Sequence, residues 1–251
     1  MLNYTETGAP DAPTVIIVHG LYGSGRNWGV IAKRLSDRFR VITPDMRNHG
    51  MSPRTDSHSY PDMAGDLAEL IAHLGGPMHV VGHSMGGKAS MLLALTRPDL
   101  VARLIVADIA PVSYGHSQIQ YINAMRAVDL SKVTRRSEAE AQLAQLGVEP
   151  ALCSFFTQSL DVPGKKWRLN LDTLAAEMDK ILGFPQVDAR FEGDTLILSG
   201  ALSDYVQRDH RPEIKRLFPQ SHFAKLPGAG HWLHAEKPRA FEAAVRTFLA
   251  G

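Results

Sequence analysis

A serine framed by glycines stands between two apolar stretches of the chain. Within Val80–Leu95, which reads VVGHSMGGKASMLLAL, Ser84 has Gly82 two positions before it and Gly86 two positions after it. Because glycine weakens both strands and helices, this arrangement indicates a turn too tight for side chains. A strained strand-to-helix turn of the G-x-S-x-G type exposes the serine hydroxyl. The pattern predicts that Ser84 is a nucleophile; the alternative is a tight turn with a bystander serine.

A serine nucleophile needs a base to accept its proton and an acid to orient that base. Several histidines follow Ser84 in the sequence, namely His116, His210, His222, His231 and His234. In the stretch PGAGHWLHAEKP, His231 directly follows a glycine-containing loop between a short predicted strand, 223–226, and the last predicted helix. We therefore predict His231 as the base. His234 lies about one helical turn further and is expected at the surface or behind the base, although the two roles could be exchanged.

An oxyanion formed on a carbonyl carbon needs hydrogen-bond donors beside the nucleophile. One donor is expected to be the N–H of Met85, which follows Ser84 at the start of a predicted helix. The second is expected from the loop HGLYGSG, where Gly20 lets the chain bend and Leu21 can aim its N–H inward. The alternative for this loop is a phosphate cradle, but it has neither a G-K-[ST] ending nor G-x-G-x-x-G spacing. No cofactor is expected.

Aromatic residues beside these motifs are candidates for substrate contact. Tyr22 adjoins Leu21 and Trp232 adjoins His231, so both are predicted to border the substrate. The stretch DMRNHGMS, 45–52, also contains a histidine, an arginine and an acid, but it precedes Ser84 and is interpreted as structural. There Asp45 and Arg47 are expected to brace the nucleophile's turn.

The elements needed to position these residues alternate along the chain. Short apolar runs predict buried strands, and amphipathic runs predict helices between them, which indicates a parallel sheet flanked by helices. The predicted strands are 14–19, 41–43, 79–81, 104–107 and 195–198, and the predicted helices are 28–35, 61–74, 84–97 and 236–249. Between 110 and 190 the strands disappear and helical patterns take over, at 117–128, 137–146 and 171–181. The expected organisation is a core of 1–110 and 191–251 with a helical cap or lid, 111–190, over the ligand-binding edge of the sheet.

Composition restricts the classes of partner. The chain of 251 residues has 27 Lys+Arg against 26 Asp+Glu, a formal net charge of +1, so no overall field attracts nucleic acid or an anionic membrane. The N-terminal stretch does not resemble a secretory signal and no apolar run reaches membrane-spanning length, so we expect a cytoplasmic protein. The lone Cys153 rules out an intrachain disulfide and a CxxC metal site, and no metal is expected. The expected partner is a small molecule.

Five motifs together resemble the α/β-hydrolase superfamily, and within it the small bacterial carboxylesterases of the YbfF type. They are HGLYGSGRNW, DMRNHGMSPR, GHSMGGKA, DIAPVSY and GAGHWLHAEKP, and they extend from His19 to Pro238. The resemblance implies an α/β-hydrolase fold with a helical cap insertion, Ser84 as nucleophile, His231 as base, and Leu21 with Met85 as oxyanion hole. It implies ester hydrolysis without metal or cofactor. One departure is a very short N-terminus, expected to lack the superfamily's usual first strand.

The identity of the acid stays open between two aspartates. Many members of the superfamily place it three residues after a strand-ending glycine, but Ser203 stands at that distance from Gly200 and Asp204 one position later. Asp108, in LIVADIAP, ends the strand that follows the nucleophile's helix, and the resemblance to YbfF-type enzymes favours it. Both preserve the chain order serine, acid, histidine. We predict Asp108 and keep Asp204 as the alternative.

The leading hypothesis is a serine esterase that cleaves small to medium carboxylic esters through an acyl-enzyme intermediate. A thioesterase, a lactonase or a hydrolase of carbon–carbon bonds would use similar residues, and the shape of the binding cavity decides between them. A non-catalytic ligand receptor of the same fold is the third reading. It is less favoured because every type of triad residue is present. The protein is expected to be a monomer or a small homo-oligomer.

Overall fold

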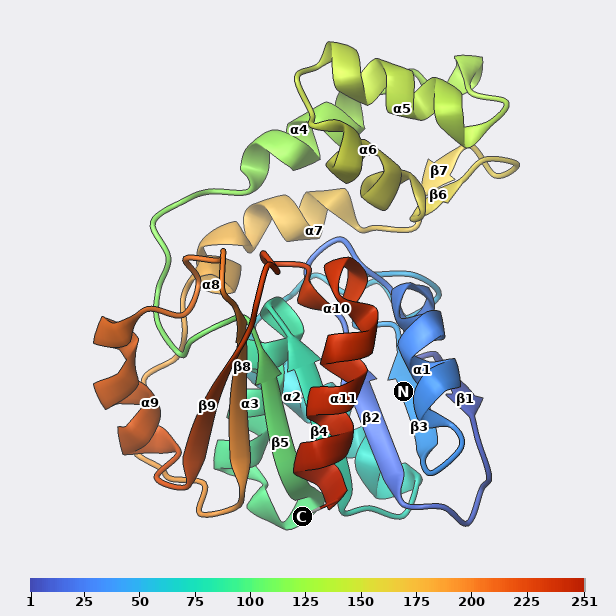
Figure 1. Cartoon of the computed structure of the whole chain (residues 1–251). Helices are drawn as coiled ribbons and strands as arrows, with labels where there is room; N and C mark the ends of the chain where they lie inside the picture. The colour runs from blue at the N-terminus through green and yellow to red at the C-terminus, as the bar shows by residue number, and fades with distance from the viewer. Residues whose placement is uncertain (251) are drawn as a thin grey trace.

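The centre of the molecule is a seven-stranded sheet, seen in the computed structural model, which describes residues 1–250 (Figure 1). Its strand order is β1-β3-β2-β4-β5-β8-β9, and all strands except the edge strand β1 run parallel. The strands are β1 (Tyr4–Thr7), β2 (Thr14–Val18), β3 (Arg40–Pro44), β4 (Met78–His83), β5 (Val101–Ala107), β8 (Thr195–Gly200) and β9 (Ser221–Leu226).

The central strands confirm the sequence-based assignment, because each contains a run of buried apolar residues. In β2, Val15–Val18 are buried, and all of β8 is buried. The N-terminus nevertheless contributes a strand that the sequence analysis did not assign. Strand β1 reads YTET and pairs antiparallel with β3. None of its four residues is buried. A polar edge strand lacks the apolar run by which buried strands are recognised.

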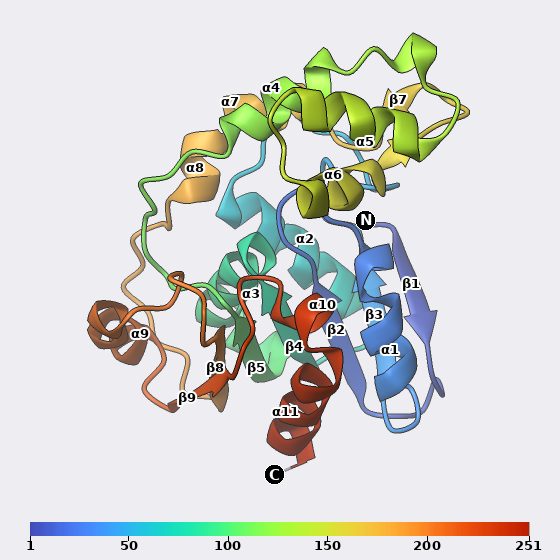
Figure 2. The ribbon, with the colours of Figure 1, turned by 45° about the horizontal axis from the view of Figure 1, so that its top comes forward.

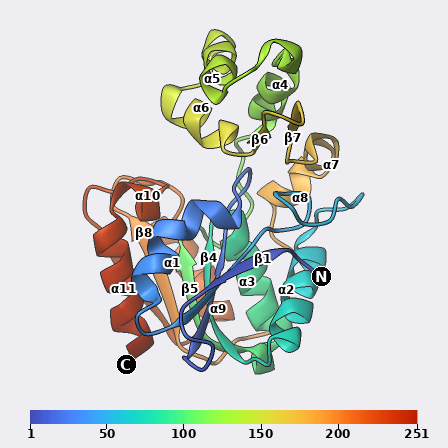
Figure 3. The same ribbon diagram turned by 90° about the vertical axis from the view of Figure 1, so that its right-hand side faces the viewer.

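Helices cover both faces of this sheet. Helices α1 and α11 lie on one face and α2 and α3 on the other (Figure 3). The helices of this part are α1 (Gly29–Leu35), α2 (Tyr60–His73), α3 (Met85–Thr96), α9 (Arg211–Leu217), α10 (Leu233–Glu236) and α11 (Pro238–Ala250). Short 3-10 turns are η1 (Gly25–Trp28), η2 (Pro98–Leu100), η3 (Leu130–Lys132) and η4 (Arg208–His210). The four helices predicted for this part are present, and α9 and α10 are additional.

The segment 111–190, called here the cap segment, lies above the carboxyl ends of the parallel strands (Figures 1 and 2). It contains α4 (Ile119–Ala127), α5 (Arg136–Gln145), α6 (Pro150–Thr157), β6 (Leu160–Asp161), β7 (Lys166–Trp167), α7 (Leu171–Ala176) and α8 (Met178–Leu182). Two expectations need correction. The segment is not free of strands, because β6 and β7 form a small hairpin. The helix predicted over 171–181 is broken at Glu177 into α7 and α8.

None of the helices described in residues 1–250 combines the length and the apolar character needed to cross a membrane.

Candidate active site

The turn between β4 and α3 holds Ser84 in an unusual backbone conformation. Its φ of 53° lies in the left-handed region, which costs a non-glycine residue free energy. The neighbouring glycines make this bend possible. A Cβ on Gly82 would lie 2.5 Å from the carbonyl oxygen of Gly86, and one on Gly86 would lie 2.5 Å from that of Val18. The close approach inferred from the G-x-S-x-G pattern is therefore present, and it lifts the Ser84 side chain to the carboxyl end of the sheet.

Three residues distant in the sequence form a chain of hydrogen bonds. The His231 imidazole contacts Ser84 Oγ through Nε2 at 3.1 Å and Asp108 Oδ2 through Nδ1 at 2.8 Å. Asp108 has no exposed surface, and its other oxygen accepts the backbone N–H of Gly200 at 2.9 Å. A carboxylate only accepts hydrogen bonds, so it fixes the His231 proton on Nδ1 and leaves Nε2 free to accept the serine proton.

The second candidate acid takes no part in this chain. The Asp204 side chain is exposed, and the hydrogen bond made by this residue runs from Gln207 to its backbone carbonyl. Ser203, which stands three residues after Gly200, donates its hydroxyl to Asp108 Oδ2. The two positions therefore meet in space: the carboxylate comes from the residue directly after β5, and the hydroxyl comes from the loop after β8. Their roles in catalysis remain predictions.

Two backbone N–H groups beside Ser84 lack a protein acceptor. Within residues 1–250, no hydrogen bond is made by the amide of Leu21 or by the amide of Met85. The carbonyl of Gly20 accepts the His19 Nδ1–H at 2.8 Å and the Gly23 N–H at 3.1 Å. Because a trans peptide points its N–H away from its carbonyl, these bonds turn the Leu21 N–H to the opposite side. This is the geometry expected of an oxyanion hole, with Met85 in the first turn of α3.

A cavity of about 270 Å³ adjoins the Ser84 hydroxyl and lies between the sheet edge and the cap segment. The cap segment supplies apolar lining through Tyr121, Leu152, Phe155, Phe156 and Ile181. Both aromatic residues predicted to border the substrate, Tyr22 and Trp232, line this cavity.

Tyr22 is more constrained than the sequence indicates. Only 3% of its surface is exposed, and its hydroxyl donates to the Gln118 carbonyl of the cap segment at 3.0 Å. Its own carbonyl accepts the Ser159 hydroxyl at 3.1 Å. Tyr22 thus connects the loop after β2 with the cap segment, and it offers the cavity its ring and not its hydroxyl. Trp232 is half-buried and packs edge-on against the His231 ring at 5.5 Å.

Two aromatic side chains that the sequence analysis did not single out, Tyr205 and His83, contact His231. Tyr205 stacks on the His231 ring with centroids 4.0 Å apart, and His83 donates from Nε2 to the His231 carbonyl at 2.8 Å. His234, which was expected at the surface or behind the base, is buried. Its ring stacks on Trp28 at 4.0 Å and packs edge-on against His83 at 4.7 Å. Burial lowers the pKa of His234 to about 3, so it remains neutral. The position of His83, next to Ser84, was the one available signal.

Lys88 is a second residue that the sequence reasoning did not single out. It lies one turn after Ser84 in α3, is 1% exposed, and donates from Nζ to the carbonyls of Leu182 and Gly183 at 2.9 and 2.6 Å. Those carbonyls end α8, so Lys88 caps a helix of the cap segment from the nucleophile's own helix. Burial lowers the pKa of its ammonium group to about 7. A lysine inside the apolar run GGKASMLLAL was the signal for a special role.

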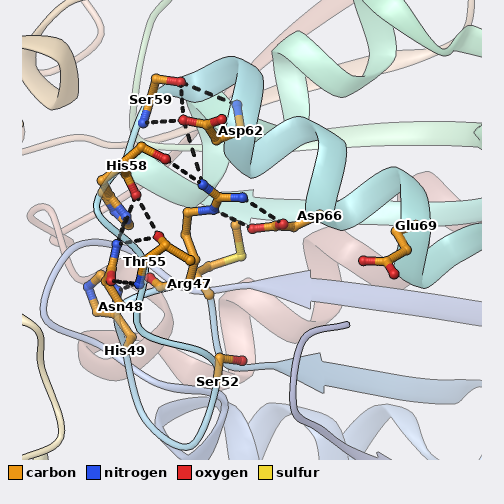
Figure 4. Close-up of polar contacts among 12 residues, drawn as sticks. Arg47, Asn48, His49, Ser52, Thr55, His58, Ser59, Asp62, Asp66 and Glu69 are labelled. Atoms are coloured by element: carbon orange, nitrogen blue, oxygen red, sulfur yellow. Dashed lines mark hydrogen bonds and ion pairs between the residues drawn. The ribbon is translucent and has the colours of Figure 1, made fainter.

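The loop 45–52 braces other elements than the sequence analysis expected. Arg47 forms a two-pronged ion pair with Asp66 of α2, at 2.6 and 2.9 Å (Figure 4). Asp45 accepts the backbone N–H groups of Gly25 and Met51, both at 2.9 Å. These bonds go to α2, to the start of η1 and within the loop, and not to the turn at Ser84. The expected bracing of the nucleophile's turn is therefore wrong, although the structural interpretation of Asp45 and Arg47 holds.

Within the described part of the chain, no group of three or more His, Cys, Asp or Glu residues gathers in a way that could hold a metal ion.

Known proteins similar to this chain include esterases and lipases. The chain is 45% identical over 254 residues to the sn-1-specific diacylglycerol lipase ABHD11 of Mus musculus, covering 97% of this chain and 83% of that protein. It is 38% identical over 239 residues to the esterase YbfF of Escherichia coli (strain K12), covering 94% of this chain and 92% of that protein. Among solved structures, a marine microorganism esterase matches with a TM-score of 0.92 at 37% identity, covering 98% of both chains.

Residues 13–238 match the family described as alpha/beta hydrolase fold. This match spans most of the chain and includes the β4–α3 turn, both oxyanion candidates and His231. The seven-stranded sheet with helices on both faces agrees with it. The protein belongs to the alpha/beta hydrolase fold family.

Proposed function

We propose that Ser84, His231 and Asp108 form the catalytic triad of a serine esterase that hydrolyses small to medium carboxylic esters. The observation that carries this proposal is the hydrogen-bond chain from Ser84 Oγ through His231 to Asp108 beside a cavity. Membership of the family and relatives named as esterases or lipases support serine-dependent ester hydrolysis. Ester hydrolysis is accordingly the activity of this protein.

In the first half of the reaction, Ser84 Oγ attacks the ester carbonyl while His231 Nε2 takes its proton. Asp108 stabilises the imidazolium that forms, and the N–H groups of Leu21 and Met85 stabilise the oxyanion. The imidazolium then gives its proton to the alkoxy oxygen, which leaves as the alcohol. The acyl group remains on Ser84.

In the second half, a water molecule attacks the acyl-enzyme while His231 takes a proton from it. The same two N–H groups stabilise the second oxyanion. Its collapse releases the carboxylic acid and returns the proton to Ser84. One His231 ring serves both halves because Asp108 and the stacked Tyr205 keep its orientation.

The cavity supports esters of modest size. Its volume of about 270 Å³ and its lining by Tyr121, Leu152, Phe155 and Ile181 favour an apolar acyl or alcohol group. The lipase relative is named for diacylglycerol, whose ester bonds are of this class. A thioesterase or another serine-dependent acyl hydrolase is the alternative, and a matched panel of oxygen esters and thioesters separates the two.

The domain organisation is part of the proposal. Residues 1–110 and 191–251 form the hydrolase core, and the cap segment, 111–190, forms the lid over the site. What supports this is the lining of the cavity by both parts. A cytoplasmic location and a monomeric or small oligomeric state remain predictions, which cell fractionation and light scattering would check.

Substitution of the nucleophile tests the proposal. Ser84→Ala is expected to reduce turnover of p-nitrophenyl butyrate to background while the protein stays folded, because no other group can carry the acyl chain. The measurement is kcat together with a thermal unfolding curve. Activity near that of the wild type in a folded Ser84→Ala variant would refute the assignment.

A further inference from the structure

The backbone N–H of Tyr22 donates a hydrogen bond to Nε2 of His49, at 3.1 Å. His49 lies in the loop after β3 and does not line the cavity, so it has no part in the mechanism given above. The bond nevertheless adjoins the proposed oxyanion donor Leu21. It also holds a residue in a rare conformation, because Tyr22 has a φ of 64°.

The hydrogen bonds of His49 fix its tautomer. Its Nδ1 lies 2.9 Å from the carbonyl of Arg47, which can only accept, so Nδ1 carries the proton. Nε2 then keeps its lone pair and can accept from Tyr22. The ring is 1% exposed and packs against His19 and His58, at centroid distances of 5.1 and 5.4 Å. Burial and these two neighbours hold the pKa of His49 well below its ordinary value, so the acceptor persists at neutral pH.

The two peptide groups on either side of Leu21 are thereby fixed separately. The carbonyl of Gly20 is held by His19 and Gly23, and the N–H of Tyr22 is held by His49. With both peptide planes hydrogen-bonded, the backbone dihedrals of Leu21 are restrained, and so is the direction of its N–H. Without the His49 acceptor, Tyr22 has a buried donor that lacks a partner and turns toward another acceptor. Rotation of that peptide would carry Leu21 with it.

The loop that carries His49 is itself anchored on two sides. Asn48 receives hydrogen bonds from Asn170 of the cap segment, at its carbonyl and at its Oδ1, both 2.9 Å. On the other side, His58 Nε2 lies 3.3 Å from the Sδ atom of Met85, the second proposed donor residue. Asn48, His49 and His58 lie together in Figure 4. His49 is therefore a fixed support and not a mobile side chain.

We propose that His49 is a positioning residue of the oxyanion hole, whose neutral Nε2 fixes the Leu21–Tyr22 peptide so that the Leu21 N–H stays aimed at the oxyanion. This inference rests on the proposed function, because it requires Leu21 and Met85 to be the donors. His49 acts through the backbone of Tyr22 and does not touch the substrate. It should affect the transition state far more than substrate binding.

Two substitutions at position 49 separate the acceptor from the packing. His49→Phe keeps a flat ring but has no acceptor, whereas His49→Gln offers an amide oxygen near the position of Nε2. The control is His79→Phe, the same change in β4 at a ring whose Nδ1 has no partner. For each variant, kcat and KM are measured with p-nitrophenyl butyrate. The inhibition constant of butylboronic acid is measured as well, because its serine adduct places an oxygen in the oxyanion hole.

For His49→Phe we expect kcat to fall about 10- to 100-fold with KM little changed, less than the ~10²–10³-fold known for complete loss of a donor. The inhibition constant of the boronic acid should rise in parallel. His49→Gln should recover most of kcat, and His79→Phe should match the wild type. Wild-type kcat in His49→Phe overturns the inference, and so does an equal loss in His49→Phe and His49→Gln, because packing would then explain the effect.

A measurement on the unaltered protein decides the matter if His49→Phe does not fold. Nitrogen-15 NMR of the imidazole should show His49 neutral, with its proton on Nδ1, between pH 6 and 8. A proton on Nε2 would overturn the inference, because that nitrogen could not accept from Tyr22. Failure of the proposed function is distinct, since it would appear as full activity in Ser84→Ala.

Discussion

At the scale of single residues, the site depends on groups that fix one another's protons. Asp108 is wholly buried, so its carboxylate contacts His231 and other protein hydrogen-bond donors instead of solvent. Ser203 adds a third donor to the same carboxylate. Because three hydrogen bonds fix the two oxygens of Asp108, this side chain is suited to hold one imidazole tautomer. These contacts support the proposal that the acid is Asp108, directly after β5, and not Asp204 in the loop after β8.

Substitution of the two aspartates tests this assignment. Asp108→Asn should lower kcat by about 10³–10⁴, because an amide can present an N–H to His231 Nδ1 and favour the wrong tautomer. Asp204→Asn is the matched control and should leave kcat unchanged, since its side chain is exposed. The measurement is kcat with p-nitrophenyl butyrate. A large loss in Asp204→Asn with none in Asp108→Asn would contradict the assignment.

The sequence predicted the residue types of the site better than their surroundings. Ser84 and His231 could be singled out because glycines next to them in the sequence, such as Gly82 and Gly230, indicate tight turns. The choice between Asp108 and Asp204 could not be made from spacing, since it depends on which loop reaches His231. The burial of His234 and Lys88 was also inaccessible, because a polar residue in an apolar segment gives no sign of the partner that satisfies it.

At the scale of elements, the site is built on one strand-to-helix junction. Strand β4 and helix α3 approach closely because Gly82 and Gly86 have no side chains. The elements predicted from apolar runs were found within a few residues of their expected bounds. The hairpin of β6 and β7 was not predicted, because two-residue strands have no periodicity to detect. The break at Glu177 was missed because the sequence there contains neither glycine nor proline.

A side chain at the elbow should destabilise the protein. In Gly86→Ala the added Cβ would meet the backbone oxygen of Val18, so we expect the free energy of unfolding to fall by at least about 1–3 kcal/mol. Gly29→Ala is the matched control. Its Cβ would meet nothing within 4 Å at the start of α1, and it should be neutral or stabilising by up to about 1 kcal/mol. Urea unfolding of the two variants measures both values; equal stability of both would argue against the tight junction.

At the scale of the whole molecule, the fold keeps a group of histidines buried and neutral. Burial lowers the pKa of each, and for His58 and His234 the value is about 3. The others are His19, His49 and His83. In the unfolded chain these rings titrate near their ordinary pKa of about 6.5. Below that pH the unfolded state binds protons that the folded state does not, so acid favours unfolding.

The pH dependence of stability should therefore be steep on the acid side of neutrality. The free energy of unfolding should be lost as the pH falls from about 6.5 toward 3, with each buried histidine contributing up to about 1.4 kcal/mol per pH unit. Between pH 6.5 and 5 the carboxylates of the unfolded chain contribute little, because their pKa values lie near 4. Urea midpoints at pH 7, 6 and 5 measure the effect. Midpoints independent of pH over this range would contradict the buried, neutral state.

The most direct measurement of the central claim is the site of covalent capture. The wild-type protein is incubated with a fluorophosphonate, and the modified residue is located by peptide mass spectrometry. One adduct on Ser84 is expected, formed much more slowly in His231→Ala, because the imidazole must take the serine proton. An adduct on another residue, or equal rates in the wild type and His231→Ala, would contradict the claim that this serine and histidine act together.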